Sequence, residues 1–304
     1  MGAQMARLAG GLYQLSRPDP TISWAVGAFA IGAGIAFGRL GVAIHWWDGL
    51  IALVGVIAAI SFGAHGLNDA YDWMTGADRA SPGEGTGGSR VIPDGRFTVR
   101  QTLLVGIAGL VVTAGMGVYF YRLYGWPVLI LTAIGVGAPI LYSVPPLALA
   151  YRPFPELVVV VPALVGVTVG SELVFSGTIT VAGVIAGSVH AAFSISWYVV
   201  SRVPDFHADR QAGKTTSVVL LGLDRAGPLS GVYLLSGGLL AVAAASIIDP
   251  IFLLSLVFGA LLATGLRTLE PRRPRQASRL RYRQMRVCTI HAFALALALA
   301  RPWG

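Results

Sequence analysis

The sequence is poor in charged residues and in cysteine. Only 12% of its 304 residues are Asp, Glu, Lys or Arg, against roughly 25% in soluble domains. The single cysteine, Cys288, excludes an internal disulfide and a zinc site built from cysteines. Residues 1–20 contain no continuous apolar run, so we expect no cleaved signal peptide there. These shortages argue against a soluble enzyme and against a disulfide-stabilised secreted domain.

Apolar residues are abundant instead. They make up 55% of the chain, whose mean hydropathy is +0.71, and a run of about 18 apolar residues is enough to cross a bilayer. We predict an all-α, polytopic membrane protein with one domain over residues 1–304. Residues 1–21 form a short amphipathic surface segment stopped by Pro18 and Pro20, and residues 22–301 form the transmembrane bundle. The nine expected spans lie near residues 22–38, 49–68, 102–120, 126–144, 156–175, 179–201, 227–247, 250–268 and 285–300.

The basic residues are unevenly distributed between the ends of these spans. Arg39, Arg122 and Arg301 fall on one side, and all the other basic residues fall with the N-terminus and the loops after even-numbered spans. This asymmetry predicts a multi-pass protein of the cell inner (plasma) membrane with its N-terminus in the cytoplasm. The pI of about 10.1 therefore reports topology and contact with membrane lipid. Nucleic acid is not an expected partner, because the basic residues lie in short loops between spans.

A first acidic cluster ends one of the most apolar runs. In "AHGLNDAYDWMTGAD", residues 64–78, Asp69 and Asp72 fall on one face if the helix continues through the motif, with Asn68 beside them. Asp78 follows six residues after Asp72. All lie on the predicted cytoplasmic side.

A second acidic cluster lies at the corresponding end of the sixth span. In "SRVPDFHADRQAGKTT", residues 201–216, Ser201, Asp205 and Asp209 recur every four residues and would form one row along a continuous helix. Two facing rows of carboxylates repel each other unless cations lie between them. Oxygen ligands of this kind suit Mg²⁺, which commonly shares its coordination with substrate phosphates.

Basic residues close to the acidic clusters complete a predicted metal–diphosphate site. Arg90 and Lys214 each follow a cluster by a short loop, and Arg152 lies in the loop after the fourth span. Their side chains are suited to phosphate oxygens. The alternative is that these aspartates only cap or solvate helix ends. Two acidic clusters at matching depth favour the metal–diphosphate site over this alternative.

The quoted motifs resemble those of the UbiA superfamily of intramembrane prenyltransferases. "NDAYDWMTGAD" is similar to its first aspartate motif and "PDFHADRQAGKTT" to its second. "RPDPTISWAVGAF" and "LYSVPPLALAYRPFPEL" resemble its entry to the first helix and its loop after the fourth span. Asp78, the Gly-Gly-x-Arg ending at Arg90, and the Tyr-Arg-x-x-x-Glu starting at Tyr151 look like the branch that prenylates dihydroxynaphthoate to make menaquinone. Ser201 and Pro155 depart from residues common in the family.

This resemblance implies a nine-helix bundle around a central cavity with a cytoplasmic cap. It implies Mg²⁺ as cofactor, a polyprenyl diphosphate as donor and an aromatic acceptor, 1,4-dihydroxy-2-naphthoate foremost. The expected metal ligands are Asn68, Asp69, Asp72, Asp78, Asp205 and Asp209. The expected substrate-binding residues are Asn68, Arg90, Arg152, Lys214 and Trp197.

Three aromatic residues are predicted near span ends. Tyr142, Tyr198 and Trp197 can stabilise an allylic cation through their ring faces, or they can belong to an interfacial aromatic belt. With Asp69, Asp72, Asp205 and Asp209, the two tyrosines form the expected catalytic set.

Other functions remain open from the sequence. A UbiA-type terpene cyclase would ionise the same diphosphate without an acceptor, and a glycerol-phosphate lipid or a carotenoid could replace the aromatic acceptor. An ion-coupled transporter is a remote alternative, because the acids lie at helix ends instead of at the bilayer midplane.

Overall fold

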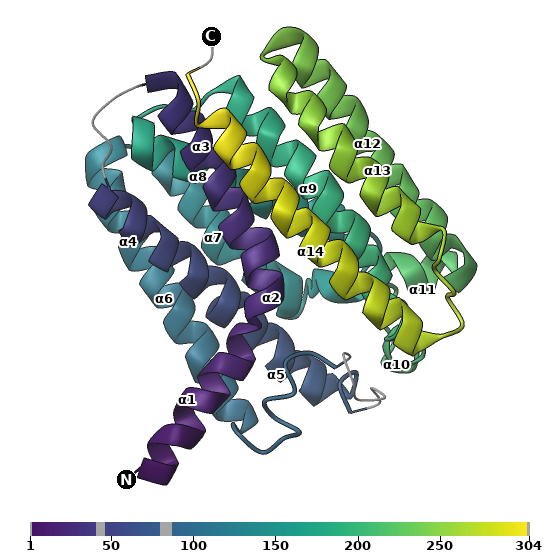
Figure 1. Ribbon diagram of the computed structural model, residues 1–304. Helices are drawn as coiled ribbons and strands as arrows, with labels where there is room; N and C mark the ends of the chain where they lie inside the picture. Colours follow the sequence, from purple (N-terminus) through teal and green to yellow (C-terminus); the bar gives the residue numbers. More distant parts are fainter. Residues whose placement is uncertain (1, 41–45, 80–86, 303–304) are drawn as a thin grey trace.

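The computed structural model describes residues 2–40, 46–79 and 87–302, and these residues form helices and connecting loops without a strand. Most of the helices run side by side in one bundle (Figure 1). The helices are α1 (Gly2–Ser16), α2 (Pro18–Thr21), η1 (Ile22–Val26), α3 (Gly27–Leu40), α4 (Trp46–Ile57), η2 (Ala58–Ala64), α5 (His65–Thr75), α6 (Val99–Tyr124), α7 (Pro127–Ser143), η3 (Leu149–Tyr151), η4 (Glu156–Val160), α8 (Val161–Ser176), α9 (Val181–Arg202), α10 (Phe206–Gln211), α11 (Ser217–Leu221), η5 (Leu223–Arg225), α12 (Ala226–Ile247), η6 (Pro250–Leu253), α13 (Leu254–Leu266) and α14 (Pro274–Leu299).

Six continuous helical segments of the described chain are long and apolar enough to cross a membrane. Two further apolar helices, Pro127–Ser143 and Pro250–Leu266, are shorter. Helix α14 carries many arginines in its first half, which makes it less apolar than these. The six long segments are Pro18–Gly38, Trp46–Thr75, Val99–Tyr124, Glu156–Ser176, Val181–Arg202 and Leu223–Ile247.

The N-terminal segment is helical, and its prolines act differently from the expectation. Helix α1 ends at Ser16, and Arg17 adopts a left-handed conformation with φ of 43°. Pro18 then begins the next helix, which continues into the first long segment. Proline suits the first turn of a helix, because its fixed φ is helical and its missing N–H would have no partner there. The prolines therefore mark the start of the first long apolar segment, and α1 ends before them.

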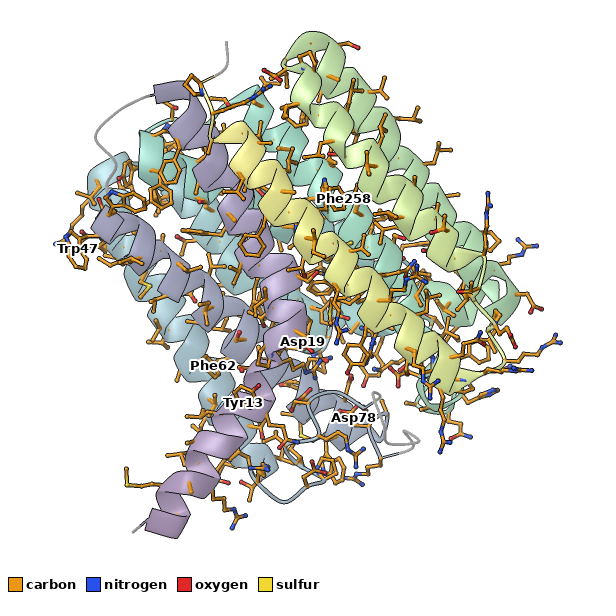
Figure 2. All side chains as sticks on the ribbon, in the orientation of Figure 1. Tyr13, Asp19, Trp47, Phe62, Asp78 and Phe258 are labelled. Atoms are coloured by element: carbon orange, nitrogen blue, oxygen red, sulfur yellow. The ribbon has the colours of Figure 1, made fainter. Side chains whose placement is uncertain are left out.

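The two acidic segments lie at one end of the bundle. Helices α5, α10 and α11 lie at the end from which α1 projects, and the C-terminus lies at the other (Figure 1). Nitrogen-bearing side chains also gather at the lower end of Figure 2, near the loop that carries Asp78. This placement follows from helices that alternate in direction, which return both motifs to the same side.

Helix α9 runs through the middle of the bundle and packs against α8, α12 and α14. Thr180 caps its N-terminus by accepting a hydrogen bond from the Gly183 N–H at 3.2 Å. The buried carboxylate of Glu172 accepts hydrogen bonds from the Thr180 hydroxyl at 2.6 Å and from its N–H at 3.2 Å. Glu172 thus holds the turn that starts α9, a role that the sequence did not reveal.

Replacing Thr180 by Ala is expected to lower the free energy of unfolding by about 2 kcal/mol, because the cap and one bond to a buried carboxylate are lost together. Thr180→Ser keeps the hydroxyl and is the matched control. Unfolding in mixed micelles, followed by circular dichroism, measures both. An equal loss in the two variants would contradict the role of the hydroxyl.

Candidate functional site

The first acidic cluster lies on an unbroken helix, as the sequence predicted. The helix runs from Trp46 to Thr75 and ends at Gly76, whose φ of 92° favours glycine. Asp69 and Asp72 are both buried. After the helix the chain turns back, and the N–H of Asp78 donates to the backbone oxygen of Asp72 at 3.2 Å. This turn brings Asp78 to the end of the helix that carries Asp72.

The second acidic cluster does not form one row on a continuous helix, so that prediction was wrong. Helix α9 ends at Arg202, and a turn over residues 203–205 precedes α10. Pro204 causes the break, since proline lacks the N–H that a continuing helix needs. Asp205 takes the N-cap position of α10 but makes no capping hydrogen bond with its side chain. Asp209 lies within α10 and is buried.

Lys214 joins the two clusters. It is the only lysine of the sequence, and its Nζ lies 2.9 Å from Asp72 Oδ2 and 3.2 Å from Asp209 Oδ1. Burial alone would lower the pKa of Lys214, but the two carboxylates outweigh burial and raise it. Lys214 is therefore a fixed cation between the two motifs. The contact also shows that acids more than 130 residues apart in sequence converge in space.

Tyr151 and Asn68 complete the surroundings of Asp72. The Tyr151 hydroxyl donates to Asp72 Oδ1 at 2.8 Å, and the Asn68 amide donates to Asp72 Oδ2 at 3.1 Å. Burial and then the Asp72 charge raise the pKa of Tyr151, so the phenol stays protonated and keeps donating. Lys214 also lies 4.9 Å from the centre of the Tyr151 ring. Asp72 is thus held from three sides.

Asp69 has different partners from Asp72. Its carboxylate binds the guanidinium of Arg17 and the hydroxyl of Ser89, and it accepts from the Ser89 N–H at 3.2 Å. Asp69 does not line the cavity described below, whereas Arg17 does. Sequence reasoning missed Arg17, although it opens the quoted "RPDPTISWAVGAF". Its left-handed backbone is the kind of local strain that accompanies functional sites.

A glycine-rich loop closes over the acids. Gly87, Gly88 and Arg90 all have positive φ, of 67°, 69° and 63°. A Cβ on Gly88 would lie 2.5 Å from Asp69 Oδ1 and 2.9 Å from Asp78 Oδ2, so only glycine fits here.

Two charged side chains lie beside this loop. Burial, followed by repulsion from the other two aspartates of the cluster, raises the pKa of Asp78 to about 8. Arg90 lines the cavity and forms an ion pair with Asp94 at 3.6 Å.

The donor set fits a hard divalent cation in its chemistry. Asp205 Oδ1 and Asp209 Oδ2 are buried without a hydrogen-bond partner, and burial and the charge of Asp209 raise the pKa of Asp205 to about 6. Unsatisfied carboxylate oxygens of this kind are the ligands that Mg²⁺ prefers. In the part of the chain that the structure describes, no three Asp, Glu, His or Cys side chains already surround one point. Lys214 occupies the space between Asp72 and Asp209 instead.

An elongated cavity of about 600 Å³ extends from these charged residues into the bundle. Residues of η4 and α8 from Val159 to Val174 line one side of it. At the rise of a helix this stretch is roughly 20 Å long. Near the motifs the wall carries Asn68, Asp72, Asp78, Arg90, Asp205, Asp209 and Lys214. Deeper in the bundle most of the lining side chains are apolar, among them Val56, Phe120, Leu131, Val167 and Leu173.

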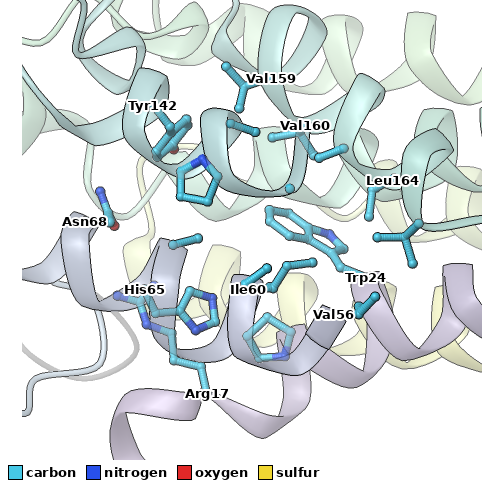
Figure 3. A pocket seen from close by; sticks show the side chains of 18 of the residues that line it. Arg17, Trp24, Val56, Ile60, His65, Asn68, Tyr142, Val159, Val160 and Leu164 are labelled. Atoms are coloured by element: carbon cyan, nitrogen blue, oxygen red, sulfur yellow. The ribbon is translucent and has the colours of Figure 1, made fainter. Parts of the chain in front are cut away.

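An aromatic cluster lies between the charged and the apolar parts of the cavity. Trp24 lies 5.0 Å from Trp197 and 5.8 Å from Tyr198 between ring centres. In Figure 3 the indole of Trp24 lies between Ile60 and the neighbouring Val160 and Leu164. Tyr142 and Tyr198 share a hydrogen bond of 2.7 Å between their hydroxyls. The predicted aromatic trio is therefore together in the cavity wall, with Trp24, which sequence reasoning missed, as its fourth member.

Arg152 is not brought to the cavity. Its side chain is exposed, and its Nε donates only a long hydrogen bond, 3.5 Å, to the Leu147 backbone oxygen. Glu156, four residues later, is fully buried and accepts a hydrogen bond from Tyr233 at 3.0 Å. Of the Tyr-Arg-x-x-x-Glu motif, Tyr151 reaches the acids, whereas Glu156 anchors the loop to the bundle.

Comparison with known proteins agrees with this architecture. One curated relative, the 1,4-dihydroxy-2-naphthoate octaprenyltransferase of Mycobacterium leprae (strain TN), is 28% identical over 199 residues, which are 65% of each chain. The match thus spans just under two thirds of that relative's length. A UbiA homologue from Archaeoglobus fulgidus, solved with GPP and Mg²⁺, has a TM-score of 0.66 at 18% identity over 95% of this chain and 99% of that one. A UbiA homologue from Aeropyrum pernix K1 has a TM-score of 0.62 at 15% identity, over 93% of this chain and 97% of that one.

At these identities the solved structures show likeness of fold alone. The model of the UbiA prenyltransferase family matches residues 25–290, which include both acidic clusters, Lys214 and most of α14. With its six long apolar helices, the chain is an integral membrane protein. It belongs to the UbiA prenyltransferase family.

Proposed function

We propose that the protein transfers an isoprenyl group from a polyprenyl diphosphate to an aromatic acceptor, with 1,4-dihydroxy-2-naphthoate as the foremost candidate. One observation supports the proposal most strongly. Asp72 and Asp209, one from each acidic cluster, both form ion pairs with Lys214 at the charged end of a largely apolar cavity. A diphosphate fits the charged end, and the long apolar end suits an isoprenyl chain. The naphthoate acceptor is supported by the Mycobacterium leprae relative's name.

The charged residues have separate parts in this proposal. Asn68, Asp72, Asp78, Asp205 and Asp209 would hold Mg²⁺, and the family's solved structures with GPP or DMAPP and Mg²⁺ support a divalent ion here. Mg²⁺, when bound, supplies positive charge to the diphosphate oxygens. Arg90 and Lys214 contact the same oxygens and stabilise the negative charge that grows as the diphosphate leaves. Asp69 holds Arg17 and the loop at Ser89 in place.

The bond changes follow from this arrangement. The allylic C–O bond breaks, and its electron pair leaves with the diphosphate. The ring carbon of the acceptor forms the new C–C bond and then loses a proton or, in dihydroxynaphthoate, its carboxyl group as CO₂. The faces of Trp24 and Trp197 form the electron-rich wall for the allylic cation. Tyr198 is less suited to that part, because the guanidinium of Arg202 lies 4.6 Å from its ring centre.

We further propose that nine segments cross the bilayer and that both acidic clusters face the cytoplasm. The six long helices, the two shorter apolar helices and α14 coincide with the nine apolar segments of the sequence. The excess of arginine at the motif end supports the cytoplasmic orientation.

Purified protein in nanodiscs, supplied with a long isoprenyl diphosphate, Mg²⁺ and dihydroxynaphthoate, is expected to form a prenylated naphthoquinol that mass spectrometry detects. Chelation of Mg²⁺ should stop the reaction, and omission of the acceptor should stop diphosphate release. Rapid release of a hydrocarbon without acceptor would favour the terpene cyclase instead. If the same assay gave a prenylated product from hydroxybenzoate, a glycerol-phosphate lipid or a carotenoid, and not from dihydroxynaphthoate, that compound would be the acceptor instead.

A further inference from the structure

Arg202 lines the cavity with hydrogen-bond donors that no carboxylate accepts, although the charges of Asp209 and Asp205 act on its guanidinium. Its Nη2 donates to the hydroxyls of Tyr142 at 2.7 Å and Tyr198 at 2.8 Å. Its Nε is buried and unpaired. Arg202 forms no ion pair with an aspartate or glutamate of the described chain. The hydrogen bonds of Arg202 thus go to neutral phenols, and its remaining N–H groups can still bind an anion.

The two phenols add to this surplus of donors. Their hydroxyls share one hydrogen bond and both accept from Arg202, so one hydroxyl hydrogen has no acceptor among the described residues. Together, the three side chains present a hydroxyl hydrogen and free guanidinium N–H groups. A ligand that only accepts hydrogen bonds and carries negative charge satisfies all of them. A carboxylate has these properties, and arginine binds it in a planar, two-point geometry.

The cluster adjoins the second acidic motif, whose Asp209 and Asp205 act on the Arg202 charge, and it extends from there towards the aromatic wall. Long side chains of a helix point back towards its N-terminus, and Arg202, the last residue of α9, contacts Tyr198 one turn earlier. Tyr198 in turn adjoins Trp24. Four other basic residues line the cavity. Arg281 stacks on Tyr282 of its own helix. The other three form ion pairs with aspartates: Arg17–Asp69, Arg90–Asp94 and Lys214–Asp72.

We propose that Arg202, Tyr142 and Tyr198 bind a carboxylate attached to the acceptor's aromatic ring, while the ring stacks against the indole of Trp24. This inference rests on the proposed function and names the acceptor class as an aromatic carboxylate. The bound carboxylate neutralises Arg202, which would otherwise repel an allylic cation forming beside it. The motif residue Ser201, which precedes Arg202, lies in the same cavity wall.

Binding without turnover tests the proposal directly. Calorimetry on the full-length protein in nanodiscs compares 1-hydroxy-2-naphthoate with 1-naphthol, which lacks the carboxylate. We expect the wild type to prefer the carboxylate by at least about tenfold and Arg202→Met to abolish the preference. Arg202→Lys keeps the charge without the planar fork and should give an intermediate preference. Arg210→Met is the matched control, because Arg210 is exposed on α10 and does not line the cavity.

Tyr142→Phe is the milder second variant, should Arg202→Met not fold. It removes one hydroxyl and should reduce the preference by about threefold. A preference that survives both substitutions would overturn the proposal.

Steady-state kinetics separate this site from the diphosphate site. Arg202→Met should raise the KM for dihydroxynaphthoate and leave the KM for the isoprenyl diphosphate unchanged. A rise in the diphosphate KM instead would assign Arg202 to the leaving group and overturn the proposal. Loss of the proposed function has a different signature: no prenyl transfer to any acceptor, with the carboxylate preference in calorimetry intact.

Discussion

Replacing Asp72 by Asn is expected to lower kcat for prenyl transfer by about a thousandfold while the chain still folds. The amide keeps the size of the side chain but removes the charge that binds Lys214 and would bind Mg²⁺. Removing one preorganised electrostatic group from an active site costs about 10²–10³ in rate, and here the second motif also loses its link to the first. Diphosphate release at saturating substrate, repeated over a range of Mg²⁺ concentrations, measures the effect.

Asp224→Asn is the matched control for this substitution. Asp224 also pairs with a basic residue, Arg272 at 3.7 Å, but its side chain is 78% exposed and lies outside the cavity wall. Exposed pairs contribute little, so the rate should stay within about twofold of wild type. Asp209→Asn, which removes the other partner of Lys214, should resemble Asp72→Asn. Full turnover in either buried variant, with unchanged circular dichroism, would contradict the role of the joined clusters.

Much of this architecture could be predicted from the sequence because the signals are local. Apolar runs of sufficient length predicted the helices, and the positions of the acidic clusters after alternate spans predicted that both would lie at one end. The spacing of Asp69 and Asp72 on a continuing helix was also correct. Such patterns depend on helical periodicity and bilayer thickness, which act over a few turns.

The parts that sequence reasoning missed depend on contacts between distant residues. Arg17 binds Asp69 across 52 positions, and this contact depends on a left-handed residue between two helices. The different environments of Asp69 and Asp72 follow from those partners and not from their spacing. Pro204 was a local signal for the break after α9, but the four-residue spacing of the acids suggested a longer helix.

The position of Arg202 changes how the aromatic wall is interpreted. The sequence offered Tyr142, Tyr198 and Trp197 as equal candidates for stabilising a cation. In the folded chain the two tyrosines bind a guanidinium, whereas Trp24 and Trp197 contact each other beside them. A cation at the Tyr198 face disfavours a second one there, so in the proposed function the indoles form the stabilising wall, and in the proposed acceptor site the tyrosines bind an anion.

Replacing Gly88 by Ala is expected to reduce prenyl transfer by about a hundredfold, the effect of displacing catalytic groups by about 1 Å. The new Cβ would lie 2.5 Å from Asp69 Oδ1, 2.7 Å from Arg17 Nη2 and 2.9 Å from Asp78 Oδ2. All three contacts are too short, so the acids and the loop must move apart. The measurement is kcat together with the Mg²⁺ concentration for half-maximal rate, which should rise as the carboxylates separate.

Gly95→Ala separates this displacement from simple backbone strain. Gly95 lies in the same loop with φ of 67°, against 69° for Gly88, but an added Cβ would meet nothing within 4 Å. Both variants therefore carry the left-handed penalty of about 1–2 kcal/mol, and only Gly88→Ala disturbs the acids. We expect similar thermal stability in the two, with the loss of activity and the altered Mg²⁺ dependence confined to Gly88→Ala. If Gly95→Ala lost as much activity, the loop would act through its backbone and not through contact with the aspartates.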